Sequence, residues 1–385
     1  MSGSGMPGSI ADERFAARLE GAIAAASGSG LHGVLVGTGP DLRYLTGYAA
    51  LPLERLTMLV LTAAGASLVV PRLEAPAAAA GLRLAIPVHT WDETDDPHAL
   101  VAGLLPIPRD AGTPRLAVSD QLWATHLLRL QAAVPRATFT AASGVLRTLR
   151  MRKDEAEIEL LRRAAQAADR VVAAIAAGRL IGRTESDVAR EVRERLVAEG
   201  HDDAAFWIVA SGPNSASPHH DASDRVIAAG EPIVIDIGGT LEGYGSDITR
   251  MIWVTGGDAA RGPDPEYLRL YGVLREAQAA ATAAVRPGVA CERIDGVARG
   301  IIDAAGYGPN FFHRTGHGIG LEGHEDPYLV AGNDEQLAPG FAFSVEPGIY
   351  LEGRYGARIE DIVVCGDGGP VVLNAAPRDL LVVAG

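Results

Sequence analysis

Two aspartates near the middle of the chain have the spacing of paired metal ligands. The segment from Glu231 to Arg250 reads EPIVIDIGGTLEGYGSDITR and holds Asp236 in an apolar, β-branched run typical of a buried strand. A hairpin turning between Leu241 and Glu242 would set Asp247 opposite Asp236, with Cβ atoms roughly 4.5–5.5 Å apart. Two buried like charges that close need a shared proton or cations between them. The pair suggests half of a two-metal site, although by itself the segment fits two solvent-exposed hairpin acids better.

Four more segments of the C-terminal half carry polar residues on apolar or glycine-rich frames. Residues 211–225 form a loop with two adjacent histidines, and residues 311–329 contain three more. AFSVEPGIY and GARIEDIVV each place one glutamate among residues typical of a buried strand. Each residue alone has a structural explanation, such as an acid at a sheet edge, but together they favour one site. The residues concerned are His219, His220, His313, His317, His324, Glu346 and Glu360.

The charges of these residues would balance two divalent cations. Four carboxylates supply four negative charges, and a neutral His317, among glycines that allow close backbone approach, completes the set. Hard oxygen ligands with one imidazole suit Mn²⁺, with Co²⁺, Fe²⁺ or Zn²⁺ as alternatives, and a thiolate zinc site is excluded because these segments contain no cysteine. Two ions roughly 3.5 Å apart would hold a bridging water and lower its pKa towards neutrality. That water is the nucleophile of a hydrolase. The four carboxylates are Asp236, Asp247, Glu346 and Glu360.

The composition fits a globular protein of two domains. The chain has 385 residues, of which 48% are hydrophobic and 21% charged. Its net charge of -14 argues against nucleic-acid binding, and its two cysteines are too few for a disulfide framework. The N-terminal segment MSGSGMPGSIADERF has no apolar core, and no apolar stretch is long enough to span a bilayer. We therefore expect a cytoplasmic protein that binds no membrane.

The N-terminal part has the pattern of a compact α/β domain. Short apolar strands over residues 31–36, 56–61 and 67–70 accompany helices over 15–26 and 98–105, with glycine and proline between them. Its histidines are scattered in sequence and are interpreted as structural or solvated. They are His32, His89, His98 and His126.

The composition shifts at Arg147, where a second domain begins. An amphipathic helix over residues 158–175 precedes a helix that Thr184 and Asp187 cap and that ends at Gly200. Helices over 265–285 and 292–305 alternate with strands over 232–237, 248–254, 341–345 and 359–364. These patterns predict an α+β domain with a mostly antiparallel sheet, and a division of the chain into residues 1–146 and 147–385.

With these residues in view, the chain resembles the pita-bread metallopeptidases, in the proline-peptidase branch of prolidase (Xaa-Pro dipeptidase) and aminopeptidase P. The resemblance covers residues 147–385, while residues 1–146 resemble the creatinase-type domain that precedes the catalytic domain. GPDLRYLTGY, from Gly39 to Tyr48, is similar to a strand-turn segment of that domain, with Asp41 where asparagine is usual. SDITR, HRTGHGIG and the complete N-terminal domain resemble the proline peptidases more than methionine aminopeptidase. Creatinase shares the fold but lacks the metal ligands.

The resemblance implies a role for each metal ligand. Asp236 would bind one metal and His317 and Glu346 the other, while Asp247 and Glu360 would bridge both. The expected metal ligands are thus Asp236, Asp247, His317, Glu346 and Glu360.

The resemblance also implies the substrate side of the site. His219 and His324 would bind the scissile peptide and stabilise the tetrahedral intermediate, and Glu346 would pass the proton of the water to the prolyl nitrogen. Arg358 would orient Glu360 and Asp247. The expected catalytic residues are His219, His324 and Glu346, and the expected substrate-binding residues are His219, His313, His324 and Arg358.

The function expected is metal-dependent hydrolysis of Xaa-Pro bonds, preferentially in dipeptides, by a hydroxide bridging two metals. The alternative is an aminopeptidase P acting on longer peptides with proline second. A non-catalytic binding protein on this fold is disfavoured because all five metal positions are present. The family also implies a homodimer. A dipeptidase must bind a free carboxylate, for which Arg43, Arg55, Arg314 and Arg354 are equal candidates, and short loops at 306–309 and 353–356 leave little surface for a longer peptide.

Overall fold

The computed structural model describes residues 10–106 and 112–385, so the start of the N-terminal segment lies outside the described residues. The described chain forms two compact units, an N-terminal unit (residues 10–150) and a C-terminal unit (residues 151–385). Within these ranges no helix combines the length and apolar character needed to cross a membrane.

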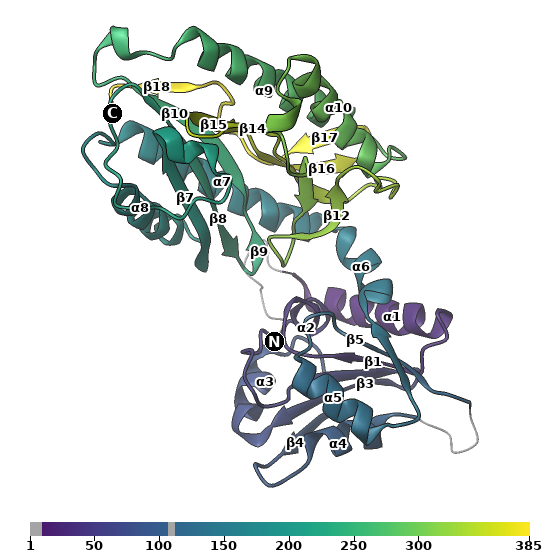
Figure 1. Ribbon diagram of the computed structural model, residues 1–385. Coiled ribbons are helices and arrows are strands. Elements are labelled where there is room, and N and C mark those ends of the chain that lie inside the picture. The colour runs from purple at the N-terminus through teal and green to yellow at the C-terminus, as the bar shows by residue number, and fades with distance from the viewer. Residues whose placement is uncertain (1–9, 107–111) are drawn as a thin grey trace. The chain divides into compact units, whose positions relative to one another are not determined.

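The N-terminal unit is built on one mixed sheet, drawn in purple to blue in Figure 1. The strand order is β4-β3-β2-β1-β5-β6, antiparallel from β1 through β3 and parallel at the pairs β3–β4, β1–β5 and β5–β6. Helices α4 and α5 pack apolar side chains against one face. The strands are β1 (Gly33–Val36), β2 (Met58–Thr62), β3 (Gly65–Pro71), β4 (Val88–Trp91), β5 (Arg115–Val118) and β6 (Thr138–Ala141). The helices are α1 (Asp12–Gly28), α2 (Pro40–Thr46), 3-10 helix η1 (Arg72–Glu74), α3 (Ala75–Gly81), α4 (Pro97–Leu104), α5 (Ala124–Ala133) and α6 (Ser143–Met151).

The segment from Gly39 to Tyr48 differs from the strand-turn expected of it. Its core is helix α2, which begins at Pro40, where the fixed φ of proline suits a first helical position. Gly47 ends the helix with φ 78°, a left-handed conformation that glycine adopts without strain. Asp41, in the first turn, forms an ion pair with Arg150 at 2.8 Å.

The C-terminal unit contains two five-stranded sheets, a two-stranded hairpin and two helix pairs (Figure 1). Within residues 151–385 the pairings are antiparallel except β10–β18, which confirms the mostly antiparallel α+β prediction. The first sheet has the order β18-β10-β8-β7 with β9 beside β8, and the second β12-β11-β13-β16-β17. The helices are α7 (Glu155–Ala177), α8 (Glu185–Ala198), α9 (Pro265–Ala284), α10 (Cys291–Ala304) and the 3-10 helices η2 (Gly212–Ala216), η3 (Ala259–Arg261) and η4 (Gly308–Asn310). The first-sheet strands are β7 (Asp203–Ser211), β8 (Glu231–Leu241), β9 (Tyr244–Gly245), β10 (Ile248–Val254) and β18 (Leu381–Val383). The others are β11 (Gly316–Gly318), β12 (Glu325–Leu329), β13 (Ala342–Val345), β14 (Gly348–Leu351), β15 (Tyr355–Arg358), β16 (Asp361–Gly366) and β17 (Gly369–Val372).

Strand alternation divides β8 between two environments. Ile233, Ile235 and Ile237 pack with the apolar residues of α7 and α8, and Val234 belongs to the separate core beneath α9 and α10. Because successive side chains point to opposite faces, Asp236 shares the face of Val234. The same strand thus provides a core face and an acidic position on the other side.

The β8–β10 register corrects the hairpin predicted from sequence. Leu241 pairs with Tyr244 and Asp236 with Thr249, so the turn centres on Glu242 and Gly243 rather than between Leu241 and Glu242. Those two residues have φ 49° and 82°, as a two-residue type I′ turn requires. Asp236 and Asp247 are therefore diagonal neighbours, not directly opposite. A shift of two residues preserves the face, so both acids still point the same way.

The predicted helices are confirmed to within a few residues, and three predicted strands start two residues later than expected, at Gly33, Met58 and Asp361. Thr184 caps α8 by accepting a hydrogen bond from the Asp187 amide at 3.1 Å, as the sequence predicts. The strand predicted to start at Ile359 begins only at Asp361. Glu360 lies in the break before it and pairs through its backbone with Thr249 instead.

Two histidines that are distant in sequence form a buried pair in the N-terminal unit. His98 on α4 and His126 on α5 are both buried, and their Nε2 and Nδ1 atoms lie 3.2 Å apart. The Asp96 carboxylate caps α4 and lies 3.6 Å from His98 Nδ1. A neutral imidazole has one donor and one acceptor nitrogen, so one ring donates to the other. The pair links α4 to α5 only while one nitrogen of the contact is unprotonated.

We predict that acid destabilises the N-terminal unit through this pair. Burial lowers the pKa of both His98 and His126 below the usual 6.5, which Asp96 partly opposes for His98. The unfolded chain therefore takes up protons near pH 6.5 while the folded pair stays neutral, and stability falls as pH drops from 7.5 to 5.5. Calorimetry between pH 7.5 and 5.5 should show that stability falls less steeply in His126→Gln than in the wild type. In His89→Gln it should fall as steeply as in the wild type. Equal slopes in all three proteins would contradict this.

Candidate metal centre

Four carboxylates and one imidazole meet in the C-terminal unit. They come from the middle of β8, the residue before β10, the centre of β11, the residue after β13 and the break between β15 and β16. All five side chains line one cavity of about 270 Å³. The structure therefore brings together every metal ligand expected from the sequence, namely Asp236, Asp247, His317, Glu346 and Glu360.

The imidazole of His317 lies close to two of the acids. Its Nε2 lies 3.1 Å from Glu346 Oε1 and 3.6 Å from Asp247 Oδ2. One ligand atom each of Asp247, His317 and Glu360 lies within 4.8 Å of the others, a spacing that one metal ion could bridge. A Cβ at Gly316 would lie 1.9 Å from the Ser344 carbonyl oxygen, so glycine allows β11 to approach β13 this closely.

Backbone and hydroxyl contacts orient the imidazole of His317. Its Nδ1 lies 3.1 Å from the Gly318 carbonyl oxygen, which places a proton on Nδ1 and directs Nε2 at the acids. The His317 amide donates to Ser344 Oγ, and that hydroxyl donates to Glu346 Oε1, both at 3.0 Å. Ser344 was missed by sequence reasoning. Its signal was a lone hydroxyl in an apolar strand, two residues before Glu346 and so on the same face.

The pKa values of the four acids are shifted in different directions. Burial raises the pKa of Asp236, Asp247 and Glu360, and repulsion from neighbouring carboxylates adds to it. Burial acts in the same sense on Glu346, but the hydrogen bond and charge of His317 outweigh it and lower its pKa to about 2. Negative charge is thus costly at three of the four acids unless cations share the cavity.

Arg358 makes different contacts from those expected. Its buried guanidinium forms an ion pair with Asp236, donates to the Tyr350 hydroxyl at 2.7 Å and to Thr249 Oγ1 at 3.1 Å. Thr249 in turn donates to Glu360 Oε2 at 2.7 Å. Arg358 therefore contacts Asp236 directly and reaches Glu360 only through Thr249. Sequence reasoning missed Thr249, although it lies two residues after Asp247 and hence on the same face.

The donor set fits divalent metal ions. Among the described residues, Asp236 Oδ1 is buried and has no hydrogen-bond partner, an expensive state for a carboxylate oxygen. The surrounding donors are carboxylate oxygens and one imidazole nitrogen, as hard and borderline divalent cations prefer. The residues present therefore suit such ions at this position.

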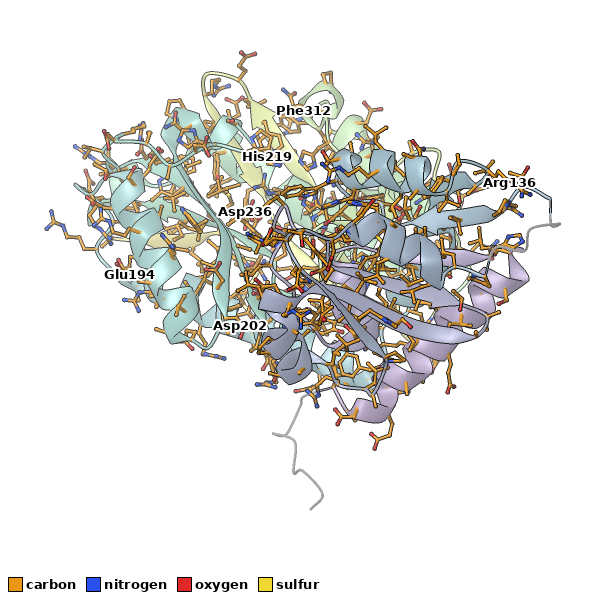
Figure 2. The ribbon with its side chains drawn as sticks, turned by 90° about the horizontal axis from the view of Figure 1, so that it is seen from below. Arg136, Glu194, Asp202, His219, Asp236 and Phe312 are labelled. Atoms are coloured by element: carbon orange, nitrogen blue, oxygen red, sulfur yellow. The ribbon has the colours of Figure 1, made fainter. Side chains whose placement is uncertain are left out.

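A second cavity of about 510 Å³ shares five lining residues with the first. His219, His313 and His324 all line it, as the sequence predicts for the substrate side. Figure 2 labels His219 and Phe312, which line this cavity, and Asp236, which lines the smaller one. The shared residues are His219, His317, His324, Glu346 and Arg358.

The imidazole of His324 lies against that of His317, with the two ring centroids 3.9 Å apart. Burial, His317 and Arg314 lower the pKa of His324 to about 4. His324 is therefore neutral at pH 7.

Comparison with known proteins assigns both halves of the chain. Residues 159–367 match the model of metallopeptidase family M24, and residues 18–152 match the creatinase/prolidase N-terminal domain. The chain belongs to the M24 metallopeptidase family and is a peptidase, which confirms the pita-bread resemblance and the fold class. The family implies divalent metal ions, which the donor set fits.

Individual relatives are similar over almost their whole length. The chain is 48% identical over 376 residues to the probable dipeptidase PepE of Mycobacterium tuberculosis, covering 96% of this chain and 97% of the relative. The crystal structure of dipeptidase PepE from Mycobacterium ulcerans has a TM-score of 0.89 at 46% identity, covering 97% of this chain and 99% of that one. A recombinant prolidase from Thermococcus sibiricus also has a TM-score of 0.89, at 35% identity and with 97% and 100% coverage.

We predict that Thr249→Val weakens metal binding. Valine keeps the shape of threonine but removes the hydroxyl that connects Glu360 to Arg358. Loss of such an outer contact typically costs about 10–100-fold in metal affinity. Titration of the metal-free protein with Mn²⁺ should show this loss. Thr240→Val, near the turn end of β8, is the matched control, and equal affinities for the two variants would refute the role of Thr249.

Proposed function

We propose that this chain is an Xaa-Pro dipeptidase that depends on two divalent ions, manganese being the best match to its donors. The observation that carries the dipeptide preference is the position of Arg314, which lines the larger cavity beside the cluster of acids. Its relatives described as dipeptidase and prolidase support the same reaction.

The proposed assignment of ligands follows the charge balance of the cluster. Asp236 would hold one ion, His317 and Glu346 the other, and Asp247 with Glu360 both. Bound ions would polarise the scissile carbonyl and supply a nucleophilic water at neutral pH. The ion pair of Arg358 with Asp236 opposes the rise in pKa that burial causes at this acid, and so favours the ionised form that a metal ligand needs.

The side chains facing both cavities have properties suited to proton transfer and charge stabilisation. Glu346 lines both cavities and is ionised at neutral pH, because its pKa is lowered to about 2. Its carboxylate would accept a proton from the attacking water and deliver it to the prolyl nitrogen. His324 Nδ1 lies 3.1 Å from Arg314, which donates to it, so its remaining proton is on Nε2. That N–H, with His219, can stabilise the developing oxyanion, a contribution of about 2.7–4 kcal/mol per donor.

Arg314 is the arginine best placed for the free carboxylate of a dipeptide. Arg354 forms an exposed ion pair with Glu266 at 2.8 Å and lines neither cavity. Arg314 forms no ion pair with an acid among the described residues, and its guanidinium carbon lies 4.4 Å from the ring centroid of Tyr328. A stacked guanidinium with free donors suits bidentate carboxylate binding. The two remaining candidates, Arg43 and Arg55, belong to the N-terminal unit.

We predict that the purified protein binds about two divalent ions per chain, as four carboxylates would balance. Elemental analysis should give this ratio. Chelation should abolish hydrolysis of Ala-Pro, and Mn²⁺ or Co²⁺ should restore it. Full activity in a rigorously metal-free preparation would refute the metal-dependent mechanism.

The dipeptide preference predicts an order of substrates. Ala-Pro should be cleaved with a higher kcat/KM than its C-terminal amide or a tripeptide. Arg314→Met should lower kcat/KM for Ala-Pro relative to the amide by about 10–150-fold, because it removes a charge-assisted contact of about 1.5–3 kcal/mol. Arg354→Met serves as the matched control. Equal or better rates of the wild type on the longer substrates would assign the chain to aminopeptidase P instead.

A further inference from the structure

One buried carboxylate outside both cavities accepts hydrogen bonds from several residues of the loop that carries His219. Glu185 is the first residue of α8, directly after the N-cap Thr184, and its side chain is 0% exposed. It lines neither the cavity of the acids nor the larger one. The hydrogen bonds of its oxygens go to the segment 211–223 rather than to the amides of its own helix.

Both ends of that segment bind Glu185 in the same way. Ser211 donates its amide and its hydroxyl to Oε1, each at 2.7 Å. Ser223 donates its amide at 3.1 Å and its hydroxyl at 2.6 Å to Oε2. Between them, the side-chain nitrogen Nδ2 of Asn214 lies 3.0 Å from Oε1 and 3.1 Å from Oε2. His220 Nε2 lies 2.8 Å from Oε2. A single side chain therefore closes the loop from Ser211 to Ser223.

These contacts require an ionised carboxylate. Burial would raise the pKa of Glu185, but the hydrogen bonds from Ser223, Ser211 and His220 outweigh it and lower the pKa to about 2. A carboxylate accepts at both oxygens, whereas an amide in its place would turn a donor towards other donors. Glutamine at position 185 therefore loses several of these bonds at once while keeping the size of the side chain.

The residues on either side of His219 are both anchored. The Pro218 carbonyl accepts from Arg358 at 3.2 Å, and Arg358 is itself paired with Asp236. The imidazole of His220 is held by Glu185. His219 itself, labelled in Figure 2, is exposed. It lines both cavities. Its backbone position relative to the acids is thus set by its two neighbours in the chain.

We propose that Glu185 is a positioning residue for His219, acting by clamping the loop 211–223 in the orientation that points His219 at the cavity of the acids. This inference rests on the proposed function, in which His219 contacts the substrate. It also explains His220, whose imidazole serves the clamp rather than the chemistry. The clamp itself is a property of the folded chain and does not require bound metal.

The first test measures the clamp without any activity. Amide hydrogen exchange in the segment 211–223 should be faster in Glu185→Gln than in the wild type. Glu194→Gln is the matched control because Glu194 is an exposed acid of the same helix, labelled in Figure 2. Unchanged exchange in Glu185→Gln would overturn the proposal whatever the activity of the enzyme. If that variant does not fold, His220→Ala removes only the bond next to His219 and should accelerate exchange in the same segment.

The second test asks whether Glu185 acts through His219. Glu185→Gln should lower kcat for Ala-Pro by about 10–100-fold with unchanged metal content, since small displacements of a catalytic group have effects of this size. In a His219→Ala background the same change should alter the rate by less than about twofold, because residues acting through one another are not additive. Additive losses would overturn the positioning role. A wild type that does not cleave Ala-Pro, or a fully active His219→Ala, would instead refute the proposed function.

Discussion

The concentration of four carboxylates around one imidazole in a buried cavity is the constraint on which the C-terminal unit depends. Burial and mutual repulsion raise the pKa of three of them, so the cluster is unfavourable as a set of free anions. The fold compensates in part with the buried cation Arg358 beside Asp236 and with His317 beside Glu346. The orphaned oxygen of Asp236 shows that this compensation from the described residues is incomplete without cations.

The same strands that carry the acids also carry the core, which couples the site to folding. On β8 the isoleucines face α7 and α8 while Asp236 faces the cavity, and on β10 Ile248 and Ile252 alternate with Thr249 in the same way. A slip of one residue in this hairpin would bury the acids against the helices and expose the isoleucines. The type I′ turn at Glu242 and Gly243 therefore secures both the core and the spacing of the acids.

The sequence predicts the parts of the site that carry a local signal and misses those defined by geometry. Acids inside apolar strands and a histidine among glycines stand out because a polar side chain is unexpected next to such neighbours. All five residues come together in the fold. The hairpin register was predicted wrongly because the predicted and observed turns, which are centred one residue apart, both place the two aspartates on the same face of the sheet. Thr249 bonds Arg358 across 109 residues of sequence, and Glu185 resembles any acid in the first turn of a helix. Contacts between such distant segments leave no pattern in the local sequence.

The two histidines expected to face the substrate share one structural solution. His219 is followed by His220, which Glu185 holds, and His324 is followed by Glu325, whose carboxylate pairs with Lys153 at 2.6 Å. Both anchoring contacts are largely buried, so removing His220 or Lys153 would leave a buried carboxylate without one of its partners. The backbone beside each histidine is therefore fixed, while each imidazole keeps a nitrogen for the substrate. In the proposed function, stabilising a developing oxyanion requires donors that are already in place, and anchoring the neighbouring residue would hold the backbone of each histidine without using the N–H that faces the substrate.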